Sequence, residues 1–146
     1  MKVAIGSDHG GFAQKEQLRS YLEEQGHDVV DHGCFSEESV DYPDYAAPVA
    51  RAVASGEADC GVLVCGTGIG MALAAGKVAG IRAANVTRPD FARLAREHND
   101  ANVVTLSGRF VDVGTNKDIL DEFLSTDFLG GRHEVRVAKM MELEHL

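Results

Sequence analysis

Short segments rich in β-branched and other apolar residues alternate along the chain with longer segments of helical composition. In the longer segments the apolar residues recur every three or four positions, which is the spacing of a helix with one buried face. The expected strands are Lys2 to Ser7, His27 to Asp31, Gly61 to Val64, Ile81 to Val86 and Asn102 to Leu106. The expected helices are Phe12 to Gln25, Asp44 to Ser55, Ile69 to Val78, Pro89 to Glu97 and Asn116 to Leu124.

This alternation predicts an α/β fold in which helices cover both faces of a sheet of five parallel strands. Right-handed crossovers make the sheet Rossmann-like and doubly wound, so a ligand should bind at the carboxyl ends of the strands. With 146 residues the chain fits one domain, and we expect residues 1–146 to form it. After Gly130-Gly131, the helical segment from Arg132 to Leu146 has no following strand. We expect that segment to pack on a partner subunit.

The charge balance excludes nucleic acid as a partner. The formal net charge is −9 at pH 7, and no arginine-rich stretch offsets it, so the surface repels a polyanion. A small anion remains compatible with this charge, because a few arginines and backbone amides gathered at one place can hold it.

Nothing in the sequence indicates a membrane span, secretion or a metal site. No apolar run reaches the roughly 18 residues that a spanning helix needs, and Met1 leads directly into the first expected strand. The three cysteines are odd in number and lack CxxC spacing, and the histidines are scattered without ligand spacing. We expect a cytoplasmic protein that uses no metal ion and no cofactor.

The loop after the first expected strand, Gly6-Ser7-Asp8-His9-Gly10-Gly11, places an acid and an imidazole at the ligand-binding edge. The alternative is that Asp8 caps the following helix and that His9 is solvated. The loop lacks the third glycine of the GxGxxG fingerprint, which argues against a nicotinamide cofactor.

The loop after the third strand, Cys65-Gly66-Thr67-Gly68-Ile69-Gly70, is the most informative segment. Its alternating glycines predict exposed backbone amides, which together with the following helix dipole form a nest for an anion. It lacks the GK[ST] ending of a P-loop, so triphosphate hydrolysis is not supported. Because a helix N-terminus stabilises a thiolate, Cys65 is a candidate base. The alternative is a small buried strand cysteine, which is what we expect of Cys34 and Cys60.

Two further groups carry side chains suited to a sugar or a phosphate. His98 and Asn99 end the fourth expected helix, where the histidine could instead serve only as a helix cap. Arg132 and Arg136 are four residues apart on the terminal helix, so both guanidinium groups can face one phosphate. The alternative is that these two arginines only form a solvated basic face of the helix.

These motifs, together with Asp41-Tyr42-Pro43 and Gly130-Gly131-Arg132-His133, resemble in order and spacing the type B ribose-5-phosphate isomerases over nearly the whole chain. The resemblance implies an isomerase that interconverts ribose 5-phosphate and ribulose 5-phosphate through a cis-enediolate. It also implies substrate contacts from Asp8, His9, Tyr42, Gly66, Thr67, Gly68, Ile69, Gly70, Asn99, Arg109, Arg132 and Arg136.

The resemblance implies three catalytic residues. His98 would protonate the ring oxygen to open the furanose, Cys65 would take the proton from C2, and Thr67 would help to move a proton between O1 and O2. One branch of the family has a cysteine where this chain has Cys65, whereas another uses a glutamate a few residues later, where this chain has only residues such as Leu73 and Ala74.

Several alternatives stay open. The same family includes allose-6-phosphate isomerases and galactose-6-phosphate isomerase subunits, which share much of the site. Rossmann-like folds also host non-catalytic sugar-phosphate sensors, and a thiol redox protein is disfavoured because Cys65 has no resolving cysteine.

Strand direction predicts a homodimer with shared active sites, while dimer and tetramer are not distinguished. Asp8 and Cys65 follow strands, whereas His98 and Asn99 precede one and belong near the opposite edge of the sheet. A two-fold axis would bring one subunit's His98 to the other subunit's Cys65.

Overall fold

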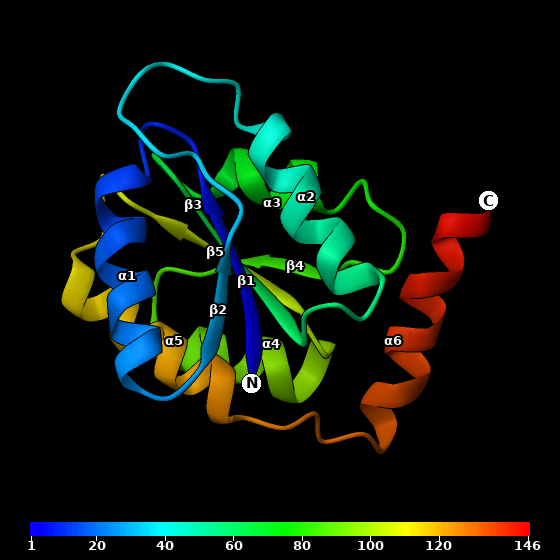
Figure 1. Cartoon of the computed structure of the whole chain (residues 1–146). Helices are drawn as coiled ribbons and strands as arrows, with labels where there is room; N and C mark the ends of the chain where they lie inside the picture. Colours follow the sequence, from blue (N-terminus) through cyan, green and yellow to red (C-terminus); the bar gives the residue numbers. More distant parts are fainter.

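The apolar segments form the strands of one parallel sheet in the computed structural model, which describes residues 1–146 (Figure 1). The strands are β1 (Lys2–Ser7), β2 (Asp28–Asp31), β3 (Cys60–Cys65), β4 (Ala83–Asn85) and β5 (Val103–Ser107). The helices are α1 (Phe12–Glu24), α2 (Pro43–Ala54), α3 (Ile69–Ala75), α4 (Pro89–Asn99), α5 (Val113–Ser125) and α6 (Arg132–Glu142), and a 3-10 turn (Leu143–His145) follows α6.

The strand order β2-β1-β3-β5-β4 places β1, β3 and β5 in the interior of the sheet. All four strand pairs are parallel, and the register aligns Ile5 with Val62 and Val64 with Leu106. Every residue of β3 and β5 is buried, because helices cover both faces. The carboxyl ends of β1, β3 and β5 therefore lie side by side.

Two apolar cores lie on the two faces of the sheet. One contains side chains of α1, α4 and α5, represented by Leu18, Ala95 and Phe123, and the other contains side chains of α2 and α3, represented by Val49 and Met71. Figure 1 shows the same two layers on either side of the strands. The predicted doubly wound, Rossmann-like sheet of five parallel strands is confirmed.

Several element boundaries differ from the prediction by one to three residues, and three of these differences have local reasons. β4 is shorter than expected because the Arg82 amide donates to the Asn102 side chain rather than to the sheet. α3 ends at Ala75, since the amides of Lys77 and Val78 bond carbonyls three residues back and so form a turn. α5 begins at Val113, before the predicted Asn116, because the Asp112 side chain caps the helix by accepting a hydrogen bond from the Thr115 amide at 2.7 Å.

The last helix, α6, stands apart from both helical layers (Figure 1). Among the helices of the two layers it lies against the C-terminal part of α4, and His133 is its only buried residue. Val135, Met140 and Leu143 expose large apolar side chains on and just after this helix. No helix in the structure combines the length and the apolar character needed to cross a membrane.

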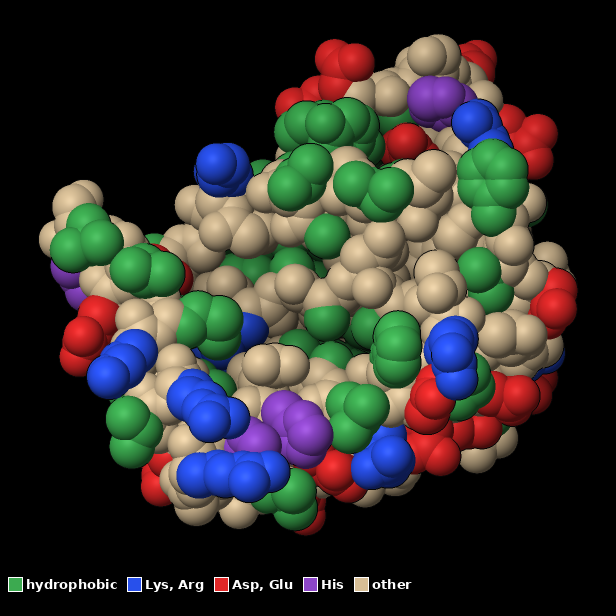
Figure 2. All heavy atoms as spheres, turned by 180° about the vertical axis from the view of Figure 1, so that it is seen from behind, with side chains coloured by type: hydrophobic (Ala, Val, Ile, Leu, Met, Phe, Trp, Pro, Cys, Tyr) green, Lys and Arg blue, Asp and Glu red, His purple; other side chains and the backbone are tan.

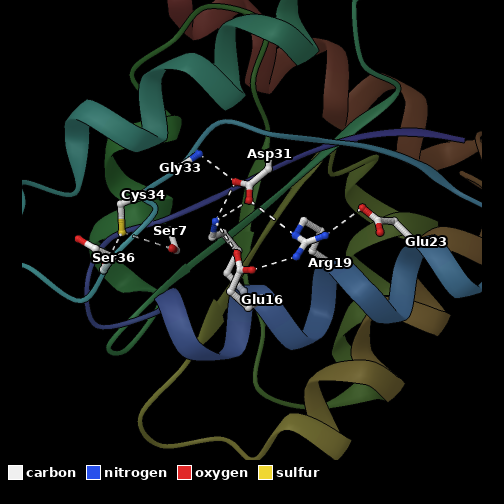
Figure 3. A network of polar contacts seen from close by, with 9 residues as sticks. Ser7, Glu16, Arg19, Glu23, Asp31, Gly33, Cys34 and Ser36 are labelled. Carbon is white, nitrogen blue, oxygen red and sulfur yellow. Dashed lines mark hydrogen bonds and ion pairs between the residues drawn. The ribbon is translucent and has the colours of Figure 1, made fainter.

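A buried ion pair ties α1 to the end of β2. The Lys15 side chain is fully buried and donates to both Asp31 oxygens, at 2.8 and 2.7 Å. Asp31 also accepts from the Gly33 amide at 2.9 Å, and Figure 3 shows the resulting network. The pair therefore anchors the start of the loop that leads to Tyr42.

Replacement of Lys15 by methionine should lower the free energy of unfolding by about 3 kcal/mol, because the Asp31 carboxylate loses its closest counter-charge. Arg19→Met is the matched control, since Arg19 is partly exposed and approaches Asp31 only to 3.8 Å, and it should cost less than about 1 kcal/mol. Urea unfolding of both variants measures the difference. Equal losses would show that the buried Lys15–Asp31 pair contributes no more to the free energy of unfolding than the partly exposed Arg19 does.

Candidate active site

Three loops meet at the carboxyl edge of the sheet and carry the residues expected to bind a ligand. Asp8 follows β1, Cys65 ends β3 and Arg109 follows β5. The Asp8 amide donates to Val64 at 3.2 Å, and the Gly108 amide donates to the Cys65 carbonyl at 2.8 Å. These bonds hold the first residues of the loops in one rigid group.

The first loop is held close to β3 by Gly11. A Cβ at this position would overlap the backbone carbonyl of Val64, so only glycine fits. The Gly11 amide donates to Asp8 Oδ1 at 3.1 Å, while Asp8 Oδ2 has no hydrogen bond within the chain. Asp8 therefore stabilises the turn into α1 with one oxygen and leaves the other for a ligand.

The thiol of Cys65 lies at the start of the glycine loop and is almost fully buried. The Gly68 amide donates to Cys65 Sγ at 3.2 Å, because a φ of +83° at Gly68 turns the chain back toward the sulfur. The sulfur therefore accepts a backbone hydrogen bond at the start of the loop and is held in a fixed position there.

The loop differs from the open anion nest that the sequence predicts. The Gly68 amide bonds Cys65 Sγ, and the Ile69 amide bonds Thr67 Oγ1 at 3.1 Å. The prediction of exposed backbone amides is wrong for Gly68 and Ile69, whose amides are used within the loop. An oxyanion here would face the remaining amides and the exposed Thr67 side chain.

Two side chains border the glycine loop. A Cβ on Gly66 would lie 3.3 Å from Arg109 Nη1, and one on Gly10 would lie 3.2 Å from Nη2, so this guanidinium crosses both loops. A Cβ on Gly70 would lie 2.9 Å from the Tyr42 ring, which therefore packs against the start of α3. The glycines leave room for both side chains.

The ring of His9 is oriented by the loop that precedes α2. Its Nδ1 lies 3.1 Å from the Val40 amide and accepts a hydrogen bond from it. In the neutral imidazole the proton must then be on Nε2, which can donate to a ligand oxygen. The alternative in which His9 is simply solvated is thus wrong for Nδ1.

The remaining candidate residues form a second group where α4 meets α6. A hollow of about 250 Å³ is lined by His98 and Asn99 of α4 and by His133 and Arg136 of α6. Arg132 is the first residue of α6. The rings of His98 and His133 are stacked, with centroids 4.3 Å apart and an interplanar angle of 13°. In Figure 2, basic side chains surround adjacent histidines on this face.

Asp100 fixes the end of α4 directly after His98 and Asn99. It has a positive φ of 49°, which ends the helix. Its carboxylate accepts from Arg96 at 2.9 Å and from Arg82 at 3.4 Å, and Arg82 Nε donates to its carbonyl at 2.6 Å. Two arginines therefore hold the turn that places His98.

No hydrogen bond joins the two groups within one chain. The first group lies at the carboxyl ends of β1, β3 and β5, and the second lies at the end of α4, which leads to the opposite end of β5. Roughly 15 Å of strand separates the two edges. One subunit thus presents two partial sites, each with only part of the predicted residues.

Sequence reasoning assigned no role to His133 or Ser107. Ser107 Oγ donates to the Gly66 carbonyl at 2.7 Å and so fixes the start of the glycine loop. Burial lowers the pKa of His133, and the positive charges of His98, Arg132 and Arg136 act in the same direction. The position of His133 one residue after Arg132 was the only signal available in the sequence.

Comparisons with known proteins agree over nearly the whole chain. A family model described as Ribose/Galactose Isomerase matches residues 3–140. Ribose-5-phosphate isomerase B of Escherichia coli is 46% identical over 143 residues, covering 98% of this chain and 96% of that protein. The solved structure of ribose-5-phosphate isomerase B from Clostridium thermocellum has a TM-score of 0.98 and 50% identity, covering 99% of this chain and 98% of that one. The enzyme from Mycoplasma genitalium, solved with bound ribulose 5-phosphate, has a TM-score of 0.95 and 42% identity, covering 99% of this chain and 96% of that one.

Proposed function

This chain belongs to the ribose/galactose isomerase family, and we propose that it interconverts D-ribose 5-phosphate and D-ribulose 5-phosphate through a cis-enediolate. The full-length similarity to proteins named ribose-5-phosphate isomerase B supports this reaction. The observation that carries the mechanism is the Gly68 amide directed at the sulfur of Cys65, beside Asp8 and Thr67. We propose residues 1–146 as one catalytic domain that acts in the cytoplasm.

The reaction requires four proton-transfer steps. His98 gives a proton to the ring oxygen while the anomeric hydroxyl gives its own proton to water, which leaves an aldehyde at C1. The Cys65 thiolate then removes the proton from C2, and the resulting enediolate is stabilised by loop amides. Thr67 assists the transfer of the proton from O2 to O1, and the thiol returns its proton to C1, which leaves O2 as the ketone oxygen.

Deuterium labelling tests this mechanism. Turnover of ribose 5-phosphate in D₂O should give ribulose 5-phosphate with deuterium at C1, because the proton on the thiol exchanges with solvent. Formation of ketose without deuterium would favour a direct hydride shift. A protein that binds the sugar phosphate and forms no ketose would instead be a sensor.

The phosphate is proposed to be held by His9 and by Arg109, Arg132 and Arg136. Arg132 and Arg136 lie on α6 with exposed side chains, four residues apart and therefore on one face of the helix. Tyr42 and Asn99 are exposed at the borders of the two partial sites and complete the proposed substrate contacts.

Arg136→Ala should raise KM about 30-fold and change kcat little, because the phosphate is remote from C1 and C2 and is bound equally in the ground and transition states. Arg136→Lys should show a smaller rise, since lysine keeps the charge and loses the bidentate fork. Steady-state kinetics with ribose 5-phosphate give both constants. A fall in kcat at constant KM would contradict a phosphate role.

A homodimer with shared active sites is proposed because each chain carries two partial sites that do not meet. The exposed apolar side chains of α6 and the position of this helix away from the sheet support its packing on a second copy. In that arrangement His98, Asn99, Arg132 and Arg136 of one subunit complete the site formed by Asp8, Cys65 and Arg109 of the other.

Mixed dimers test the shared site. Cys65→Ala and His98→Ala chains, each inactive alone and carrying different affinity tags, are co-expressed and the mixed dimer is isolated through both tags. One of its two sites contains both intact residues, so about half of the wild-type activity should return. An inactive mixed dimer would place both residues in a site within one chain.

A further inference from the structure

His133 contacts His98 closely although the two residues belong to different helices. It lies in the first turn of α6 and is 8% exposed, and its ring stacks on that of His98 at 4.3 Å. The turn at Gly130 and Gly131, both with positive φ, brings the start of α6 against α4. The His133 amide closes this turn by donating to the Gly130 carbonyl at 3.1 Å.

His98 is unusual for a proton donor because no hydrogen bond within the chain holds either of its ring nitrogens. A catalytic imidazole is commonly oriented by a carboxylate or carbonyl bound to its second nitrogen. His98 has instead the flat face of His133, nearly parallel to its own ring. The ring of His98 therefore has a parallel aromatic neighbour instead of a hydrogen-bonded one.

Burial and the surrounding charges both lower the pKa of His133 and so favour its neutral ring. His98 and Glu97 face it from α4, and Arg132 and Arg136 face it from α6. Burial is the main cause of its lowered pKa, the three basic groups add to it, and only the Glu97 carboxylate opposes them. The neutral ring of His133 can stack its π-face on His98 whether His98 is neutral or is the cation that donates a proton.

We propose that His133 is a positioning residue for the isomerase reaction: its stacked ring holds His98 in the orientation that protonates the ring oxygen of the substrate. The proposal rests on the proposed function, in which His98 opens the furanose. A general acid must reach its target oxygen within hydrogen-bond distance, so a ring that rotates freely loses much of its effect.

Two substitutions separate positioning from simple support of α6. His133→Ala removes the stacked ring and should lower kcat for ribose 5-phosphate about 100-fold, with KM within threefold of wild type. His133→Phe keeps a flat ring without a titratable group, so it should restore kcat to within about fivefold of wild type. Val137→Ala, in the same hollow, is the control that loosens packing without touching the stack, and its kcat should stay near the wild-type value.

The expected pattern differs from that of a structural role. If His133 only docked α6, its loss would displace Arg132 and Arg136, and KM would rise instead of kcat falling. A His133→Ala protein with wild-type kcat, or a His133→Phe protein as slow as His133→Ala, would overturn the proposal.

Nuclear magnetic resonance distinguishes failure of this proposal from failure of the proposed function. The ring signals of His98 should broaden or shift in His133→Ala and return toward wild type in His133→Phe. These signals need no turnover, so a wild-type protein inactive on ribose 5-phosphate would refute the function alone. Unchanged His98 signals in His133→Ala would refute the positioning role.

Discussion

Cys65→Ala is expected to lower kcat for ribose 5-phosphate on the order of 1,000-fold, because the base that removes the C2 proton is lost. KM should change little, since the residues proposed to hold the phosphate do not contact Cys65. The Gly68 amide at 3.2 Å from Sγ holds the sulfur in a fixed position at the start of the glycine loop, where the proposed base must lie.

Cys60 provides a matched control because it begins the strand that Cys65 ends. Burial raises the pKa of Cys60 to about 12, so this thiol stays protonated and unreactive. Cys60→Ala should keep wild-type kcat apart from any loss of stability. Iodoacetamide should alkylate Cys65 before Cys60 and Cys34, and substrate should protect it, as peptide mass spectrometry can show. A Cys65→Ala protein that keeps a tenth of wild-type kcat would mean that another group is the base.

His98→Ala should show the second large loss, about 100-fold or more in kcat for ribose 5-phosphate, because the furanose must then open without a proton donor. Such a variant acts only on the open-chain aldehyde. At high enzyme concentration its rate should therefore stop rising with added enzyme, since spontaneous ring opening becomes limiting.

The dependence of rate on enzyme concentration is the measurement that separates ring opening from other roles of His98. The rate of the wild-type enzyme should remain proportional to enzyme concentration over the same range. The rate of His27→Ala should do so too; this control replaces a histidine whose ring lies beside the N-terminal amine. If the His98→Ala rate stays low and strictly proportional to enzyme, His98 acts at a step other than ring opening.

The fold followed from the sequence because the strands are short, mostly apolar and separated from one another by helical stretches. The boundaries that differ depend on side-chain bonds to the backbone, such as Asn102 to the Arg82 amide, which periodicity does not show. Strand direction was also enough to place Cys65 and His98 at different edges of the sheet.

The site was predictable as a set of motifs but not as a set of contacts. The use of the Gly68 amide by Cys65 depends on the φ of one glycine, and the stacking of His133 on His98 depends on how α6 meets α4. The two stacked histidines are 35 positions apart in the sequence, so no local pattern reports their contact.

The most direct test of the account is the kcat/KM of the purified protein on ribose 5-phosphate, allose 6-phosphate and galactose 6-phosphate, each measured with and without EDTA. No three His, Cys, Asp or Glu side chains are grouped as a metal site would require, and the proposed acid and base are His98 and Cys65. We predict that ribose 5-phosphate gives the highest value and that the chelator leaves it unchanged. Absence of ribulose 5-phosphate, or activity that EDTA abolishes and a divalent ion restores, would contradict the account.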